Sequence, residues 1–159
     1  MITAVDTNIL LDILITDETY SKSSKKLLDT YTEEGQLVVC EIVYAELASQ
    51  FLSEGAVRDF FADTGIKLIN SDEKTLYIAG ERWAAYTRNK KRHLQCAQCG
   101  EHVTVVCPRC NYPLSFRQRI ISDFIIGAHA LMNADLFLSR DRGFYGTYFK
   151  DLKIQQANE

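Results

Sequence analysis

The sequence predicts an α/β domain with a parallel sheet, and three observations lead to that fold class. Short apolar segments typical of buried strands alternate with longer segments whose apolar residues recur at helical spacing. The chain of 159 residues is 47% apolar and 25% charged, which suits one globular core. It contains no internal repeat and no flexible linker. We therefore expect a single domain over residues 1–159.

The first half of the chain predicts three strands separated by helices. Apolar runs predict strands at residues 2–5, 36–40 and 66–69. Helical spacing predicts helices over residues 8–15, 18–31, 42–52 and 54–62. Cys40 lies in one of the apolar runs and is expected in the core.

The second half predicts two longer helices and two strands. Ser71 is the expected N-cap of the first helix, because a serine oxygen can accept from a free N–H of the first turn. That helix has an apolar stripe ending at Tyr86 and continues to residue 92. The elements expected after it are a helix at 120–131, a strand at 136–138, a polar loop at 139–143 and a short strand at 149–154.

Charge is distributed unevenly along the chain. The formal net charge is −3, but residues 88–119 hold seven Lys or Arg and one acid, Glu101. Such a patch suits contact with a polyanion, and a solvated helix end is the alternative that charge alone leaves open. The predicted nucleic-acid-binding residues are Arg88, Lys90, Lys91, Arg92, Arg109, Arg117 and Arg119.

Four cysteines lie in a segment without periodicity, residues 93–116, which we call the cysteine insertion. Cys96, Cys99, Cys107 and Cys110 are spaced C-x2-C-x7-C-x2-C, a pattern typical of structural Zn²⁺ bound by four thiolates. Gly100 and Asn111 each follow the second cysteine of a pair, where a tight turn needs left-handed backbone. Disulfides or free thiols are the alternative. His93, His102 and His129 are expected to be structural or exposed.

Four acids lie where a parallel sheet would bring functional groups together. Asp6 follows the first strand, Glu46 and Asp123 lie early in helices, and Asp141 follows the strand at 136–138. Ligands of open α/β sheets bind outside the carboxyl ends of the strands, so these acids are expected to converge. Each acid taken singly could equally be a helix cap or a surface group. A cluster of carboxylates prefers Mg²⁺ or Mn²⁺, ions that activate water for phosphodiester hydrolysis.

The chain resembles the PIN-domain nuclease superfamily, and within it the VapC-type toxins of prokaryotic toxin–antitoxin pairs. The motifs are V-D-T-N-I-L-L at 5–11, Y-A-E-L at 44–47, I-S-D-F-I-I-G-A-H-A at 121–130 and L-S-R-D-R-G-F at 138–144. The resemblance implies a three-layer α/β/α fold with a central parallel sheet, here with an added zinc module. It also implies a Mg²⁺- or Mn²⁺-dependent endoribonuclease that acts on RNA through Asp6, Glu46, Asp123 and Asp141.

The resemblance extends to supporting residues and partners. Thr7, Asn8 and Ser139 would orient the acids or the attacking water. An antitoxin or another protein partner and a homodimer are also implied. Four further acids have no counterpart in the motifs and are expected to be surface or capping groups: Asp12, Glu41, Asp135 and Asp151.

The cysteine insertion departs from the minimal toxins, so both a toxin and an RNA-processing nuclease remain open. A catalytically silent module that binds nucleic acid or protein through the insertion is the alternative function. Tyr112 and Phe116 would then offer stacking surfaces, or they would only pack the small zinc module. The longest apolar runs are interrupted by acids, and no basic and apolar leader opens the sequence. We expect a cytoplasmic protein without a membrane span.

Overall fold

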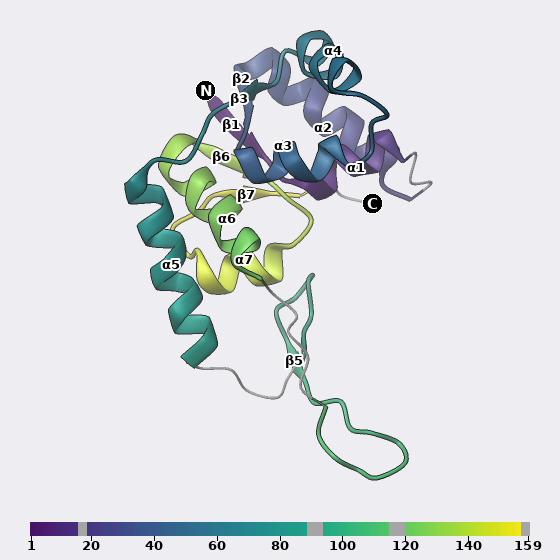
Figure 1. Ribbon diagram of the computed structural model, residues 1–159, viewed down its shortest axis with the longest axis vertical. Coiled ribbons are helices and arrows are strands. Elements are labelled where there is room, and N and C mark those ends of the chain that lie inside the picture. Colours follow the sequence, from purple (N-terminus) through teal and green to yellow (C-terminus); the bar gives the residue numbers. More distant parts are fainter. Residues whose placement is uncertain (16–18, 89–93, 115–119, 157–159) are drawn as a thin grey trace.

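A five-stranded sheet forms the centre of the molecule (Figure 1). The computed structural model describes residues 1–15, 19–88, 94–114 and 120–156. The sheet has the order β3-β2-β1-β6-β7, and all four strand pairs are parallel. The predicted α/β architecture with a central parallel sheet is therefore confirmed. Its strands are β1 (Ile2–Val5), β2 (Gln36–Val39), β3 (Lys67–Leu68), β6 (Leu136–Leu138) and β7 (Ile154–Gln155).

The helices gather on two sides of the strands. In Figure 1, α1 to α4 lie around β1, β2 and β3, while α5, α6 and α7 lie toward the β6–β7 side. The bounds are α1 (Thr7–Leu14), α2 (Ser21–Glu34), α3 (Glu41–Ala48), α4 (Glu54–Thr64), α5 (Glu73–Arg88), α6 (Ile121–Asn133) and α7 (Arg142–Tyr148). Within the described residues, no helix is both long and apolar enough to cross a membrane.

The direction of winding reverses next to β1. The chain first proceeds from β1 to β2 and β3, and then returns through α5 and α6 to β6 on the other side of β1. Ala4 of β1 is thus paired with Val38 of β2 and with Phe137 of β6. Ligands of open α/β sheets bind at such a switch point, beyond the carboxyl ends of the strands. In this chain those ends lead into Asp6 and Ser139.

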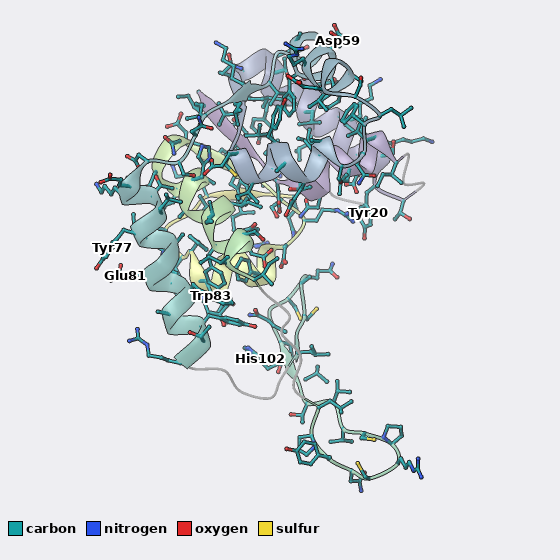
Figure 2. All side chains as sticks on the ribbon, in the orientation of Figure 1. Tyr20, Asp59, Tyr77, Glu81, Trp83 and His102 are labelled. Carbon is teal, nitrogen blue, oxygen red and sulfur yellow. The ribbon has the colours of Figure 1, made fainter. Side chains whose placement is uncertain are left out.

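Aromatic side chains join α5, α6 and α7 into one core. Phe124 of α6 is fully buried and contacts Trp83, Phe144 and Tyr148, with ring centroids 5.0–5.5 Å apart. Figure 2 shows Tyr77 on the outer side of α5 and Trp83 on the side that faces the body. Of the predicted stripe of α5, Ala79, Trp83 and Tyr86 pack inward, whereas Leu76 is exposed.

Several element boundaries differ from the sequence predictions. The helix predicted at 42–52 ends at Ala48, and the helix predicted to begin at residue 18 begins at Ser21. Asp72, not Ser71, caps α5: its Oδ1 accepts from Thr75 N at 2.8 Å. Ser71 instead donates through its backbone N and its hydroxyl to Glu41 Oε2.

The region predicted as a loop and a strand near the C-terminus contains a helix. The helix α7 begins within the predicted loop 139–143, and Phe149, the predicted start of a strand, is its C-cap. The last strand is shorter than predicted and begins at Ile154. The seven residues of α7 include two glycines, which have low helix propensity, so the sequence did not indicate a helix here. The burial of its apolar side chains stabilises this helix instead.

The described part of the cysteine insertion, residues 94–114, projects away from the body (Figure 1). Its strands β4 (Leu94–Gln95) and β5 (His102–Val103) are antiparallel and connected by residues 96–101, of which 96–100 form the first cysteine turn. Residues 107–111 form the second cysteine turn, next to the isolated bridge between Val106 and Pro113. Gly100 and Asn111 have φ angles of 79° and 56°, which confirms the expected left-handed backbone.

Candidate active site

Asp6 is the most buried acid of the predicted quartet. It directly follows β1 and occupies the N-cap position of α1, where its side chain is 5% exposed. Its Oδ2 accepts from Ser139 Oγ at 2.6 Å and from Asn8 Nδ2 at 2.7 Å. Two of the three predicted supporting residues therefore contact Asp6, and they come from opposite ends of the chain.

Burial raises the pKa of Asp6 from 3.8 to about 7. The hydrogen bonds from Ser139 and from the Thr7 backbone lower this pKa, whereas the negative charges of Asp141 and Glu46 raise it further. A buried carboxylate near two other acids is costly unless a cation or hydrogen-bond donors compensate it. The negative charges of Glu46 and Asp141 thus act on Asp6, although no three acids of the described residues are grouped closely enough to hold one metal ion.

Glu46 is connected to this group through Thr7. It lies on α3, and its Oε2 accepts a short hydrogen bond from Thr7 Oγ1. Thr7 is the first residue of α1 and is buried, whereas Glu46 is exposed. The third predicted supporting residue thus orients an acid on a neighbouring helix.

Asp141 is held in the turn between β6 and α7. Its backbone N donates to Ser139 Oγ at 3.0 Å, and its Oδ1 caps α7 by accepting from Phe144 N at 3.1 Å. Because Ser139 also donates to Asp6, one hydroxyl connects two acids of the quartet.

Asp123 lies in the first turn of α6, as predicted. Its Oδ2 accepts from Ile120 N at 2.9 Å, and the side chain is partly buried. The helix α6 packs against β1 and α3, the elements next to Asp6 and Glu46. That Asp123 joins the other three acids at one cation remains a prediction.

The prediction that Asp12 is a surface or capping acid is wrong. Asp12 is 2% exposed and forms an ion pair with Arg140, at 2.9 Å between Oδ1 and Nη2. Ser24 Oγ also donates to its Oδ2 at 2.6 Å. The Arg140 guanidinium lies over the Tyr20 ring at 4.4 Å from its centroid. Sequence analysis missed this pair, because Arg140 lies far from Asp12 in the sequence.

The predictions for Cys40, His129 and Asp135 are consistent with the structure. Cys40 is buried, and burial raises the pKa of its thiol to about 11, so it is inert in the core. Burial also lowers the pKa of His129, which is therefore neutral and structural. Asp135 accepts from Ile2 N at 2.8 Å at an exposed position.

Each cysteine turn brings together two of the four predicted zinc ligands. Backbone N–H groups directed at Cys96 and Cys107 lower the pKa of both thiols, those of Cys99 and Arg109 having the largest effect. Each also has a side-chain contact with the second cysteine of its pair. None of these four cysteines forms a disulfide bond. Within the described part of the chain, however, no three His, Cys, Asp or Glu side chains are arranged to hold one metal ion.

Most of the predicted nucleic-acid contacts fall outside the described residues. These are Lys90, Lys91, Arg92, Arg117 and Arg119, together with His93 and Phe116. Arg88 at the end of α5 and Arg109 in the second cysteine turn are described, and both are exposed.

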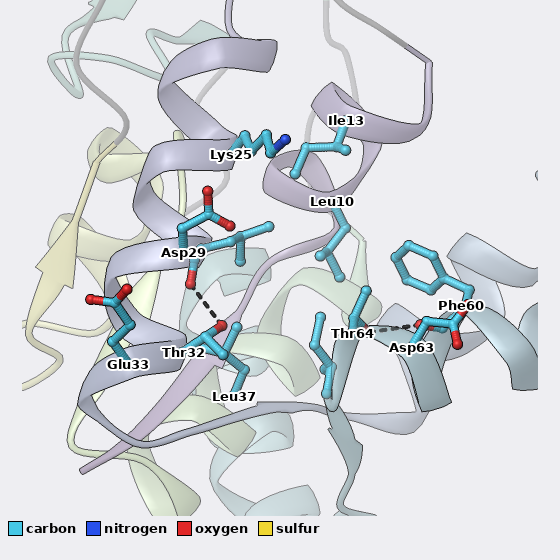
Figure 3. A pocket seen from close by; sticks show the side chains of 12 residues that line it. Leu10, Ile13, Lys25, Asp29, Thr32, Glu33, Leu37, Phe60, Asp63 and Thr64 are labelled. Atoms are coloured by element: carbon cyan, nitrogen blue, oxygen red, sulfur yellow. Dashed lines mark hydrogen bonds between the residues drawn. The ribbon is translucent and has the colours of Figure 1, made fainter.

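A separate cavity of about 650 Å³ opens between α1, α2 and α4 (Figure 3). Leu10, Leu28, Leu37 and Phe60 form its apolar base, while Lys25, Asp29, Glu33 and Asp63 contribute charge at the rim. None of the four predicted acids lines it. The acidic site and this cavity are therefore different places on the molecule.

The fold and the site together define a class of α/β domain with acids at the carboxyl ends of a parallel sheet. The PIN domain family model matches residues 3–150, and the chain belongs to this family. No curated protein matches the chain in sequence.

Solved structures share this fold over nearly the whole chain. One is VapBC2 from Rickettsia felis bound to a DNA fragment from its promoter, with 16% identity, a TM-score of 0.62, and coverage of 99% of this chain and 100% of that one. VapBC-1 from nontypeable Haemophilus influenzae has 17% identity and a TM-score of 0.62, and both chains are covered fully. A toxin–antitoxin complex from Klebsiella pneumoniae has 17% identity and a TM-score of 0.56, with 99% and 98% covered.

Proposed function

We propose that the protein is a metal-dependent endoribonuclease whose acidic quartet is Asp6, Glu46, Asp123 and Asp141. One observation carries the proposal: Ser139 Oγ donates to Asp6 and accepts from Asp141 N, while both Asp141 and Glu46 raise the pKa of Asp6. Three acids from distant parts of the chain thus act on one another at the switch point of a PIN domain. RNA is the proposed substrate.

The chain's own residues hold these acids before a cation arrives. Ser139 and Asn8 fix the Asp6 carboxylate, and Thr7 fixes that of Glu46. Asp6 would hold the cation together with Asp123, Glu46 and Asp141. Bound Mg²⁺ or Mn²⁺ would supply Lewis-acid activation of a water and neutralise charge on the phosphodiester. The exposed Arg88 and Arg109 would contact the RNA backbone, as would the basic residues outside the described ranges.

The test is cleavage of a structured and of a single-stranded RNA by the wild type and by Asp123→Asn. Each is assayed with Mn²⁺, with Mg²⁺ and with EDTA. We expect cleavage that needs the cation and falls by about 100-fold or more in the variant, because a ligand carboxylate is lost. Asp59→Asn, which changes an exposed acid on α4, is the control and should cleave like the wild type.

Zinc in the cysteine insertion is the second part of the proposal. The lowered pKa values of Cys96 and Cys107 favour thiolates, and each cysteine turn already brings one pair together. Binding of one Zn²⁺ by all four cysteines requires the two pairs to converge, with metal binding supplying the energy. Purified protein should then contain about one Zn²⁺ per chain, as four-thiolate sites do, and Cys110→Ser should lose it.

A protein partner is the third part. The similar structures from Rickettsia felis, Haemophilus influenzae and Klebsiella pneumoniae are those of toxin–antitoxin complexes. We therefore propose a toxin role with an antitoxin that blocks cleavage, and a homodimer in the absence of that partner. A chain that cleaves RNA, stays monomeric and does not inhibit growth when expressed would instead support an RNA-processing nuclease.

A catalytically silent binding module would give a different result. The projecting insertion, with the exposed Tyr112 and Arg109, is the feature that favours this reading. In that case, the folded wild type would bind RNA without cleaving it in any cation, and Asp123→Asn would bind equally well. Cys96→Ser would then abolish binding.

A further inference from the structure

The first cysteine turn is in direct contact with the helix that carries Asp141. Ala97 O accepts from Gly143 N at 2.7 Å, and Gly143 is the second residue of α7. Gln95, which precedes the turn and is 7% exposed, donates through Nε2 to Thr147 Oγ1 at 2.8 Å. Thr147 in turn donates to Gly143 O at 2.7 Å. A chain of hydrogen bonds therefore runs from the insertion into α7.

The backbones approach so closely that only glycine fits at this contact. A Cβ on Gly143 would lie 2.4 Å from Cys96 O, 2.7 Å from Gly100 N and 2.8 Å from Ala97 O. All three are backbone atoms, which cannot rotate away as a flexible side chain can. Gly143 does not have a positive φ, so the close approach is the reason for glycine here.

This contact also affects which backbone N–H groups of α7 can bind the Asp141 carboxylate. The first N–H groups of a helix have no partner within the helix. In α7, Ala97 O accepts from Gly143 N, and Asp141 Oδ1 accepts from Phe144 N. If Ala97 were withdrawn, Gly143 N would become a second donor seeking the Asp141 carboxylate. That carboxylate would be drawn further onto the helix and away from a cation shared with Asp6.

We propose that Gln95, Gly143 and Thr147 are positioning residues for Asp141, so that the docked first cysteine turn sets how tightly the acidic site binds its cation. The inference rests on the proposed function, because it takes Asp141 as a cation ligand. It assigns the insertion a role in the PIN domain itself, apart from any contact with RNA or a partner.

The test uses two matched pairs of variants on α7. Thr147→Val removes the hydroxyl from an exposed residue with little change of shape, whereas Thr147→Ser keeps it. Gly143→Ala places a methyl group against the first cysteine turn, whereas a Cβ on Gly146 of the same helix meets no atom within 4 Å, which makes Gly146→Ala the control. Mn²⁺ binding is measured by electron paramagnetic resonance of the free ion, and RNA cleavage is followed across Mn²⁺ concentrations.

We expect Thr147→Val and Gly143→Ala to weaken Mn²⁺ binding by about 10-fold. This is the lower end of the effect of losing a hydrogen bond to a metal ligand, because both residues act on Asp141 through α7 and not by direct contact. Thr147→Ser and Gly146→Ala should bind Mn²⁺ like the wild type. At saturating Mn²⁺ the KM for RNA should be unchanged in Thr147→Val, Thr147→Ser and Gly146→Ala. Gly143→Ala is judged by Mn²⁺ binding alone, because it displaces the insertion that carries Arg109. Thermal unfolding shows whether each variant is folded. If Gly143→Ala does not fold, the Mn²⁺ affinity of Thr147→Val alone tests the inference.

Unchanged Mn²⁺ affinity in a folded Thr147→Val would overturn the inference. It would also be overturned if Thr147→Ser lost as much Mn²⁺ affinity as Thr147→Val. If the wild type cleaves RNA and the variants bind Mn²⁺ normally, the inference alone fails. If the wild type cleaves no RNA but Thr147→Val binds Mn²⁺ more weakly than the wild type, the proposed nuclease activity is overturned and the positioning role is supported. A wild type that binds no Mn²⁺ overturns both.

Discussion

Asp6 couples the stability of the metal-free protein to pH. Its pKa is raised by burial to about 7 in the folded chain, and its ordinary value is 3.8. Between these values the folded chain keeps a proton that the unfolded chain releases. The free energy of unfolding therefore decreases as the pH rises from about 4 to about 7.

Asp6→Asn should remove this dependence and stabilise the metal-free protein at pH 8. The gain is at most about 4 kcal/mol, since each pKa unit corresponds to about 1.4 kcal/mol. Urea denaturation in EDTA at pH 5 and pH 8 measures it. Asp59→Asn is the control at an exposed position and should follow the wild type at both pH values. A variant less stable than the wild type at pH 8 would contradict the prediction.

The ion pair of Asp12 and Arg140 should stabilise the fold far more than a surface pair does. Its side chains are 2% and 33% exposed, and Arg140→Gln would leave Asp12 buried without a cation. We expect a loss of about 3 kcal/mol from the free energy of unfolding. Arg58 and Glu54, at 3.7 Å and with 70% and 80% exposure, form the matched surface pair. Arg58→Gln should cost about 0.5 kcal/mol or less. If Arg140→Gln and Arg58→Gln lose the same free energy of unfolding in urea, burial does not strengthen the pair of Asp12 and Arg140.

The sequence predicted the polar neighbours of Asp6 but not the partner of Asp12. Asn8 and Ser139 belong to motifs that the resemblance identified, and the structure places both on the Asp6 carboxylate. The burial of Asp12 depends on Arg140, which lies 128 positions later in the chain. No local pattern encodes such a pair, because its energy comes from tertiary contacts.

Two helix glycines have opposite surroundings. A Cβ on Gly127 of α6 would lie 2.6 Å from the Phe149 ring, and Phe149 is fully buried. A Cβ on Gly80 of α5 would meet no atom within 4 Å. Gly127→Ala should therefore destabilise the fold by about 2 kcal/mol through overpacking. Gly80→Ala should stabilise it by up to about 1 kcal/mol through helix propensity. Thermal unfolding of both variants is the measurement, and shifts of the same sign would refute the comparison.

Elements with strong periodicity were predicted well, and elements held by distant contacts were not. The apolar stripe of α5 gave the helix correctly, yet its cap moved from Ser71 to Asp72 because Glu41 binds Ser71. The helix α7 was missed, since its stability comes from burying Phe144 and Tyr145 and from the carbonyl of Ala97. Propensity alone cannot reveal such a helix.

Trp83, the single tryptophan, lies in the aromatic core that joins α5, α6 and α7. It packs against Phe124 and Tyr86, with ring centroids 5.5 Å and 5.6 Å away. In urea, its fluorescence and the loss of helical circular dichroism should follow the same transition. Removal of zinc by a chelator should leave its emission unchanged. A shift of emission on chelation alone would show that the body depends on the metal.

At the scale of the whole molecule, the parallel sheet was predictable and its strand order was not. Alternating strands and helices indicate parallel pairing, but the return from β3 to the far side of β1 leaves no mark in the periodicity. That return brings Asp141 next to Asp6, whereas Glu46 is brought there earlier in the chain by α3, which follows β2. The four-cysteine zinc site and the place of Asp123 remain predictions.

The pairing of β1 with β6 has a consequence for synthesis on the ribosome. Asp6 is translated well before the residues that bind its N–H and carboxylate, because Leu138 and Ser139 lie more than 130 positions later in the chain. Contacts of such high sequence separation form late in folding. A nascent chain therefore has no assembled acidic cluster until Ser139 and Asp141 have been translated. For the proposed nuclease, this means that a chain still lacking these residues cannot cleave the RNA of the ribosome that makes it.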